Sequence, residues 1–430
     1  MLSVSEEIVV VEKIPKIEGH MNFSVVIRGG KVVKARAEAL EGIRLLERLL
    51  VGMSFREVPD VASRMCGVCQ AIHKVTAVQA VEDALGIELP EELEMLRKLV
   101  VIGGHLQSHI LHLYFFVLPN FLGRRSILDL LPDNEELVKT VLKLKKLANA
   151  LTEITGGRAV HPVTPVVGGF SKIPSRHSLE RALALMKKFK ELLGEPLDVI
   201  LSLDMPDFKR KTTYVSLYTG RDFPLLRGKV KISGWKVFEP HEYENYIEYV
   251  TENYSSARHY VLRNGSEYMV GALARLNVNY ELLSDSAKEL AETYGLKFPS
   301  NRPFDNNKAQ ALELLHFSEE AITILEELLG RAIKTKKVPF KLSEGEGVSV
   351  TEAPRGLLIH HYKLDSRGRV EKANIITPTA QNYKCMEADA LDYVTSLLGR
   401  EDADVKHELE KLIRAYDPCV SCSARFFREH

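Results

Sequence analysis

Four of the five cysteines form two C-x-x-C pairs, and thiols are well suited to metal or redox chemistry. The pairs are Cys66 with Cys69 and Cys419 with Cys422, and Cys385 stands alone. Two intervening residues let both sulfurs of a pair bind one centre, and Gly67 permits the close backbone approach that this requires. A zinc ribbon places its pairs about 15 to 20 residues apart, whereas these pairs lie near opposite ends of the 430-residue chain. If all four thiols meet, they close the fold around its centre.

On spacing alone, three interpretations of the cysteines stay open: a structural zinc site, a redox-active metal site, and unconnected thiols. Four arginines lie inside or beside Gly/Pro-rich or cysteine-bearing segments: Arg64, Arg158, Arg355 and Arg425. A structural zinc site has no use for fixed cations, but a site that holds anionic ligands does. The arginines therefore favour the redox-active site, with solvated loop arginines as the alternative.

The motifs together resemble those of the catalytic large subunit of [NiFe] hydrogenases. They occur in the family's order along nearly the whole chain: Lys16–His20, Arg64-x-Cys66-Gly67-x-Cys69-x-x-x-His73, Gly157-Arg158-x-x-His161-Pro162, Ala353–Gly356, Thr377-Pro378-Thr379-x-x-Asn382 and Asp417-Pro418-Cys419-x-x-Cys422. The resemblance is to the soluble, cytoplasmic, bidirectional type, in the sulfhydrogenase or NAD(P)-linked branch. The quinone-binding subunit of respiratory complex I shares the fold but lacks the four thiolates, so the cysteines argue against that relative.

The resemblance implies a nickel ion held by all four thiolates and an iron ion that carries carbon monoxide and two cyanides. By position, Cys69 and Cys422 would bridge nickel and iron, and Cys66 and Cys419 would bind nickel alone. Soft thiolates suit a redox-active nickel, and a terminal thiolate such as Cys419 can accept the proton when H2 splits.

The resemblance also implies roles for residues around the metals. Glu18 would take the proton from the terminal cysteine, Arg355 would sit over the metals near one cyanide, and Thr379 would donate a hydrogen bond to the other. Pro354 would shape the apolar wall, His73 would point toward a bridging cysteine, and Glu47 would bind a buried magnesium or similar ion. By residue type alone, Glu18 could end a strand, Glu47 could be a solvated helix charge, and Arg355 could lie on the surface.

Three positions depart from the family's pattern. Ser108 takes the place of an aspartate, a difference associated with soluble cytoplasmic forms, and Arg425 replaces the histidine ligand of the magnesium site. Residues 426–430 lie beyond the usual processing point, which indicates either an unprocessed precursor or a retained tail. Outside the motifs, Cys385 is interpreted as a buried helical thiol. The histidines at 105, 109 and 112 are interpreted as satisfied core residues, with a proton path as the alternative.

The composition excludes several functions. Lys plus Arg (58) equals Asp plus Glu (58), so the chain lacks the positive field that binding to nucleic acid or an anionic membrane requires. The start, MLSVSEEIVVVEK, is acidic where a signal peptide needs a basic patch, which predicts a cytoplasmic protein. The apolar stretch 99–119 contains Gln107, Ser108 and three histidines, which favours a buried helix over a membrane span.

The elements that must position these residues are mainly helices. The pattern predicts a mainly α protein with β regions (α+β): a long-helix bundle core, a small N-terminal sheet and peripheral β segments. Predicted helices cover 41–51, 59–66, 74–85, 90–118, 134–155, 177–203, 280–294, 308–335, 385–398 and 403–415, and predicted β runs cover 8–12, 23–27, 32–35, 213–219, 230–237, 259–276, 357–363 and 370–376. One domain, 1–430, is expected, with parts at 1–40 (β), 41–205 (helical, first cysteine pair), 206–280 (α+β insertion), 281–346 (helical) and 347–430 (hairpin, final helices and second pair).

These observations predict a hydrogenase subunit that catalyses H2 ⇌ 2 H+ + 2 e−. The chain has no further cysteine motif for iron–sulfur clusters and no G-x-G-x-x-G fingerprint, so electrons must leave through partners. The expected partners are an iron–sulfur small subunit and flavin- or NAD(P)-binding and ferredoxin-like subunits, with NAD(P)+ or polysulfide as the acceptor. The alternative is a non-catalytic scaffold with a structural Zn(Cys)4 site.

Overall fold

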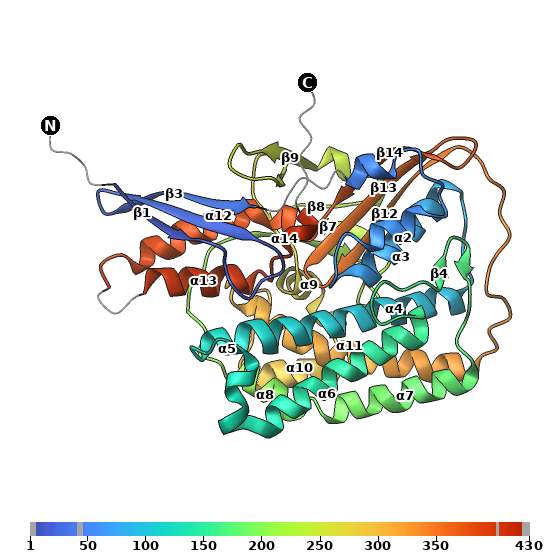
Figure 1. The fold of residues 1–430 in the computed structure, drawn as a ribbon, viewed down its shortest axis with the longest axis horizontal. Coiled ribbons are helices and arrows are strands. Elements are labelled where there is room, and N and C mark those ends of the chain that lie inside the picture. Colours follow the sequence, from blue (N-terminus) through green and yellow to red (C-terminus); the bar gives the residue numbers. More distant parts are fainter. Residues whose placement is uncertain (1–5, 41–45, 401–403, 424–430) are drawn as a thin grey trace.

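Long helices form the larger part of the fold. The computed structural model describes residues 6–40, 46–400 and 404–423. Four long helices pack side by side in one layer of the molecule (Figure 1): α4 (Glu91–Ile110), α6 (Leu131–Gly156), α7 (Arg176–Glu191) and α11 (Asp305–Gly330). Two shorter helices, α8 (Gly194–Leu201) and α10 (Asp285–Thr293), join this layer. The predicted helical bundle is confirmed.

The most apolar stretch of the chain lies inside this bundle. Helix α4 continues through a π-helical segment (Leu111–Val117) into α5 (Leu118–Phe121). Among the described residues, this continuous Glu91–Phe121 helix is the one long and apolar enough to cross a membrane, and 83% of its most apolar window is buried in the protein. The prediction of a buried core helix is therefore confirmed.

Three sheets of three or four strands lie outside the bundle. The N-terminal sheet has the antiparallel order β1 (Glu6–Val11), β2 (Met21–Arg28) and β3 (Lys31–Ala39). The second sheet has the order β11 (Tyr268–Met269), β6 (Thr213–Tyr218), β7 (Lys229–Ile232) and β8 (Lys236–Phe238), beside the hairpin β9 (Ile247–Thr251) and β10 (Arg258–Leu262). The third sheet is the meander β12 (Gly345–Ala353), β13 (Gly356–Leu364) and β14 (Val370–Ile376). The two remaining strands within the described ranges, β4 (Pro165–Val166) and β5 (Gly169–Phe170), form a short antiparallel pair.

The central helix α3 (Gln70–Ala84) packs against the third sheet. The approach is very close at Gly347, where a Cβ atom would lie 2.2 Å from the backbone N of Ala84 and 2.3 Å from the carbonyl O of Ala80. Only glycine fits such a backbone-to-backbone contact. This contact places the β12–β13 turn next to the start of α3.

The C-terminal helices connect the N-terminal sheet to the rest of the protein. Helix α12 (Pro378–Leu397) packs on β3 and β10, and α13 (Val405–Ala415) packs on α12 and β1. Figure 1 shows the N-terminal sheet in blue beside these two helices in red. The shorter helices are α1 (Leu46–Leu50), α2 (Val58–Ser63), α9 (Ala272–Asn279) and α14 (Val420–Ser423), with 3-10 turns at Ile127–Leu130, Pro240–Asn245 and Tyr280–Leu282. The N-terminal sheet and the helices α12 and α13 therefore lie in one region of the fold.

Several predicted elements were wrong in extent. The predicted helix 177–203 is two helices, α7 and α8, because Pro196 lacks an N–H and its ring clashes with a helical carbonyl four residues earlier. The predicted β run 259–276 contains β10 and the short strand β11, and the chain then enters helix α9 at Ala272 after Gly271, whose φ is 130°. Helix α12 begins at Pro378 rather than 385, since proline fits the first turn of a helix. Of the predicted helix 41–51, residues 41–45 lie outside the described part.

Candidate metal centre

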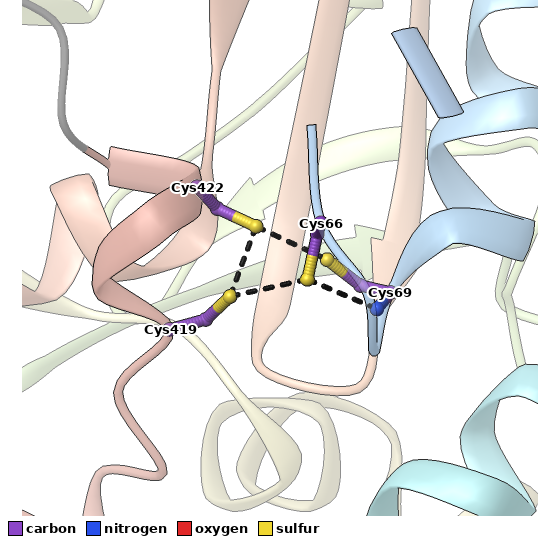
Figure 2. A group of neighbouring side chains, drawn as sticks. All are labelled: Cys66, Cys69, Cys419 and Cys422. Carbon is purple, nitrogen blue, oxygen red and sulfur yellow. Dashed lines mark hydrogen bonds between the residues drawn. The ribbon is translucent and has the colours of Figure 1, made fainter. Parts of the chain in front are cut away.

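The two cysteine pairs meet in one cluster, although 353 residues separate their facing members. The sulfur–sulfur distances are 3.3 Å between Cys66 and Cys419, 3.3 Å between Cys69 and Cys422, and 2.9 Å between Cys419 and Cys422. All four thiols are buried, free of disulfides and within 4.8 Å of one another. Figure 2 shows the sulfurs converging from the two chain segments. Of the three interpretations of the cysteines, unconnected thiols are thereby excluded.

Local backbone geometry presents the first pair. Cys66 lies in the turn after α2, where its sulfur accepts hydrogen bonds from the backbone N–H groups of Val68 and Cys69, both at 3.2 Å. Cys69 is the residue that caps the N-terminus of α3. The positive end of a helix stabilises a thiolate, so this cysteine lies where a metal-binding sulfur is favoured.

The second pair follows the end of α13. The chain leaves that helix through Asp417, whose φ of 49° lies in the left-handed region, and then passes Pro418 and Cys419 into the single turn α14. Asp is one of the few residues that tolerate this conformation. The sharp change of direction turns Cys419 and Cys422 toward the first pair.

A buried arginine lies beside the thiols. Arg355, at the β12–β13 turn, donates from Nε to the carbonyl O of Asp417 (2.6 Å) and from Nη2 to its carboxylate Oδ1 (2.8 Å). The third nitrogen, Nη1, is buried and has no hydrogen-bond partner among the described residues. An unpartnered buried donor next to four thiols is a place for an anionic ligand.

Burial and neighbouring groups shift the pKa values of the four thiols. Burial raises the pKa of Cys69, Cys419 and Cys422, well above the usual value for the latter two. Burial also acts on Cys66, but hydrogen bonds with the other three thiols and the charge of Arg355 lower its pKa well below the usual value. The hydrogen bonds between the thiols outweigh the charge of Arg355 among these causes, and one thiol of the four is shifted toward the thiolate. Metal cations are needed to ionise the rest, and four soft donors around one point suit nickel and iron.

Glu18 reaches this cluster from the N-terminal region. Its carboxylate Oε2 lies 3.1 Å from the sulfur of Cys419, and its Oε1 accepts from the hydroxyl of Ser421 at 2.5 Å. The backbone N–H of Ser421 donates to Oε2 (3.1 Å), and that of Val420 donates to the carbonyl of Glu18 (2.9 Å). The structure thus brings Glu18 to the cysteine that the sequence analysis named as its proton donor.

Thr379 and Pro354 also lie at the cluster. The Oγ1 atom of Thr379, in the first turn of α12, accepts from the backbone N–H of Cys419 at 2.9 Å, which leaves its own hydroxyl proton available to a ligand. Pro354 precedes Arg355 in the β12–β13 turn, and its carbonyl accepts from Nη2 of Arg275 at 3.0 Å. Both residues are buried.

Two other predicted site residues have different immediate contacts. His73, buried on α3, has its Nδ1 3.0 Å from Nε2 of His360, whose own Nδ1 lies 2.6 Å from the hydroxyl of Tyr362. Its contact with a bridging cysteine stays a prediction. Glu47, on α1, accepts from the backbone N–H of Ile375 at 2.9 Å, and a magnesium ion there stays a prediction. Arg425 and residues 426–430 lie outside the described part of the chain.

Asp417 has a role that the sequence did not predict. This aspartate belongs to the second cysteine motif, but its pairing with Arg355 was not anticipated. Its Oδ2 also accepts from Nε2 of Gln310 (3.2 Å), and the Oε1 atom of Gln310 lies 2.6 Å from Nδ1 of His112. A buried arginine needs a counter-ion, so the motif aspartate was the available signal.

The histidines at positions 105 and 109 lie in the protein core, in a group separate from the four thiols. His105 bonds the carbonyl of Glu352 (2.9 Å) and His109 bonds the carboxylate of Glu313 (2.8 Å), each through Nε2. The Nδ1 atoms of both rings are buried without a partner among the described residues, so these core histidines are satisfied only in part. These rings and Glu313 could together hold a metal ion, but Arg275 forks onto both oxygens of Glu313 at 2.6 and 2.7 Å and neutralises it. No cation is needed there.

Cys385 and Ser108, the residue that departs from the family's pattern, are both buried in helices. Cys385 is fully buried on α12 against Arg210 (3.1 Å) and the hydroxyl of Tyr416 (3.3 Å), and burial raises its pKa. The interpretation as a buried helical thiol is confirmed. Ser108 is buried on α4, and its hydroxyl has no partner within the described ranges.

Comparisons with known proteins agree with this site. The sequence profile of the family described as nickel-dependent hydrogenase matches residues 44–136 and 232–425. The chain is 35% identical to sulfhydrogenase 2 subunit alpha of Pyrococcus furiosus, over 98% of this chain and 100% of that protein. It is 27% identical to the beta subunit of the NAD-reducing hydrogenase HoxS of Cupriavidus necator, over 96% of this chain and 94% of that protein.

Solved structures show the same fold. A chain of an NAD+-reducing [NiFe]-hydrogenase in its H2-reduced state superposes with a TM-score of 0.88 and 25% identity, covering 98% of this chain and all of that one. The Ni-Fe-Se hydrogenase of D. vulgaris Hildenborough superposes with a TM-score of 0.77 and 24% identity over the same shares, which supports the fold alone.

A large-subunit fold that closes around four converging thiols defines a hydrogenase. The chain belongs to the nickel-dependent hydrogenase family and is the catalytic large subunit of a [NiFe] hydrogenase. The family assignment decides against the non-catalytic scaffold with structural zinc. Relatives named as alpha and beta subunits show that such a chain works with other subunits.

Proposed function

We propose that this subunit splits H2 reversibly and heterolytically at a nickel–iron centre, with Cys419 and Glu18 as the first proton acceptors. The observation that carries this proposal is the 3.1 Å contact between the Cys419 sulfur and Glu18 Oε2, at the edge of the four-thiol cluster. A thiolate that gains a proton needs an acceptor within hydrogen-bond reach, and Glu18 is in reach.

The four thiolates would hold both metals. Cys66 and Cys419 would bind nickel alone, and Cys69 and Cys422 would also bridge to iron, which carries carbon monoxide and two cyanides. The metals supply the polarisation and the electron acceptance that thiols and carboxylates cannot provide. The contact of Glu18 with Cys419 supports this division, because the thiolate that is not shared between metals is the more basic one.

The residues around the thiols would hold the ligands and exclude water. Arg355 offers its free Nη1 to the open side of the cluster, while Asp417 holds the rest of the guanidinium. Thr379 offers its hydroxyl proton to a cyanide, and Pro354 forms part of the apolar wall. His73 would act on a bridging cysteine through its orientation by His360.

A second metal ion is proposed near Glu47. A hard cation such as magnesium takes oxygen ligands, and the Glu47 carboxylate at the α1–β14 junction is one candidate ligand. This ion would have a structural role rather than take part in the reaction.

Electrons would leave through other subunits. Outside the cluster the chain has one cysteine, Cys385, which is buried against Arg210, so an iron–sulfur cluster must be held elsewhere. We expect an iron–sulfur small subunit, followed by ferredoxin-like and flavin- or NAD(P)-binding subunits in a cytoplasmic complex. The names of the relatives, sulfhydrogenase and NAD-reducing hydrogenase, favour NAD(P)+ or polysulfide as the final acceptor.

Metal analysis of the purified protein, combined with infrared spectroscopy, tests the centre. The proposal expects about one nickel and one iron per chain, with absorption bands from carbon monoxide and cyanide. Zinc without nickel or iron, together with no such bands, would contradict it. A matched Cys385→Ser variant should retain both metals, because Cys385 lies outside the cluster, whereas Cys66→Ser should lose nickel.

A further inference from the structure

Arg414 links the two chain segments that form the proton exit. We infer that Arg414 is a positioning residue that holds Glu18 beside Cys419, an inference that rests on the proposed proton-accepting role of Glu18. Arg414 lies in the last turn of α13, and its side chain is completely buried. It precedes Cys419 by five residues, so it belongs to the segment that delivers the second cysteine pair.

The guanidinium of Arg414 binds the backbone that leads to Glu18. Its Nη2 donates to the carbonyl of Pro15 at 2.5 Å, and its Nε donates to the carbonyl of Lys16 at 3.4 Å. Lys16 has a φ of 59°, a left-handed conformation that a non-glycine residue adopts only when its surroundings impose it. The two hydrogen bonds therefore hold a turn that would otherwise be unfavourable, two residues before Glu18.

Burying the charged guanidinium of Arg414 costs free energy, and the hydrogen bonds that position the Glu18 segment offset this cost. The nearest carboxylate is that of Glu410, whose Oε2 lies 3.9 Å from Nη2, and burial lowers the pKa of Arg414 to about 10. An apolar side chain of similar volume would fill the same space more cheaply. What distinguishes arginine here is a set of donors that reaches two carbonyls at once.

The segment that carries the second cysteine pair also binds Glu18 directly. Val420 and Ser421 bind its carbonyl and its carboxylate, as described above. The carbonyl of Arg414 itself lies 2.8 Å from Nε2 of His112, which ties the end of α13 to the bundle. Without the Arg414 donors, the turn at Lys16 is free to relax, and the 3.1 Å contact between Glu18 and Cys419 lengthens.

The first test measures the placement directly, by amide hydrogen exchange of the complete enzyme. The N–H of Val420 donates to the carbonyl of Glu18, so its exchange reports whether the two segments stay together. Arg414→Met should speed the exchange of this amide at least tenfold, while amides of α4 exchange as in the wild type. Arg414→Lys, which keeps a donor, should restore part of the protection. Lys411→Gln, on the same helix but in a partly buried ion pair with Glu408, is the control.

The second test measures proton exit in the same variants. The reaction D2 + H2O → HD + HDO requires proton exchange with solvent, whereas ortho–para conversion of H2 requires only cleavage and re-formation of the bond at the metals. Arg414→Met should lower HD formation at least tenfold, with ortho–para conversion and nickel content retained, and Arg414→Lys should recover part of it.

Two outcomes would overturn the inference. One is unchanged exchange of the Val420 amide in Arg414→Met, and the other is a parallel loss of HD formation, ortho–para conversion and nickel, which would assign Arg414 to the metal centre. If Glu18→Gln itself retains HD formation, the proposed role of Glu18 fails. The amide exchange still decides whether Arg414 holds the segment.

Discussion

Arg355 and Asp417 form a buried ion pair beside the four thiols, with Nη2 and Oδ1 2.8 Å apart and side-chain exposures of 3% and 2%. Arg355 comes from the β12–β13 turn and Asp417 from the turn that delivers Cys419, so the pair joins two segments that are distant in sequence. Because Asp417 occupies two of the three guanidinium nitrogens, the third is held in a fixed direction.

Replacement of Arg355 by lysine should separate metal binding from turnover. Lysine keeps the charge but has one nitrogen, so it cannot bind the carbonyl and the carboxylate of Asp417 and also face the metals. We expect nickel and iron contents near those of the wild type and H2-dependent dye reduction lowered at least about tenfold, the loss of roughly one strong hydrogen bond. Arg331→Lys, in a surface ion pair with Glu91, should retain full activity. Full activity in Arg355→Lys would remove this arginine from its proposed role.

Replacement of Glu18 by glutamine should block proton exit. Glutamine keeps the shape and can still accept from Ser421, but it cannot take a proton from Cys419. The rate of HD formation from D2 in H2O should fall about a hundredfold, within the usual range for loss of a general base, with the metals in place. Glu12→Gln, on the exposed part of the same N-terminal region, should leave this rate unchanged. Unaltered exchange in Glu18→Gln would mean that protons leave by another route.

Replacement of Gly347 by alanine should destabilise the fold strongly. The added Cβ would meet backbone atoms of Ala80 and Ala84, which cannot rotate away. We expect the free energy of unfolding to fall by about 3 kcal/mol, the upper end for overpacking of a core. Gly330→Ala, at the end of α11 with no atom within 4 Å of the new Cβ, should change it by about 0.5 kcal/mol in the stabilising direction. Urea unfolding of both variants measures the difference, and equal midpoints would refute the close contact.

Stability should decrease as the pH falls below about 6, partly through His259. Burial, and then the charge of Lys384, lower the pKa of His259 from its ordinary 6.5 to about 3. Between these two values the unfolded chain binds a proton that the folded chain does not, so stability is lost by about 1.4 kcal/mol per pH unit. His259→Phe keeps the stacking on Tyr383 and removes this dependence.

The pH profile of urea unfolding checks this prediction. The slope between pH 4 and pH 6 should be smaller in His259→Phe by about one proton's contribution, and the two profiles should run parallel above pH 7. Tyr249→Phe, on the paired strand β9, changes no group that titrates in this range and serves as the control. Identical slopes in all three proteins would show that His259 titrates normally in the folded state.

Local rules predicted much of the fold. The apolar stretch 99–119 lies in the buried helix that runs from α4 through the π-helical segment into α5, and the turn at 365–368 joins β13 and β14 as expected. Both predictions succeeded because short-range periodicity and turn chemistry act within a few residues. The break before Pro196 was missed, and Ala272–Leu276, the first part of helix α9, was interpreted as part of a β run. In the second case the helix begins directly after Gly271, whose φ is 130°, and the packing there is close: a Cβ atom added to Gly271 would lie 3.3 Å from the carbonyl O of Arg355.

The sequence by itself determined which residues could do the chemistry. The C-x-x-C spacing places each pair of thiols within reach of one centre, since two residues span one backbone turn, and the order of the motifs identified the family. Only the tertiary structure decided what these residues touch. The contacts between Glu18 and Cys419, Arg355 and Asp417, and Arg414 and Pro15 join residues 62 to 401 positions apart. No local rule predicts such contacts, because they exist only once the packing of the whole core has brought these distant segments together.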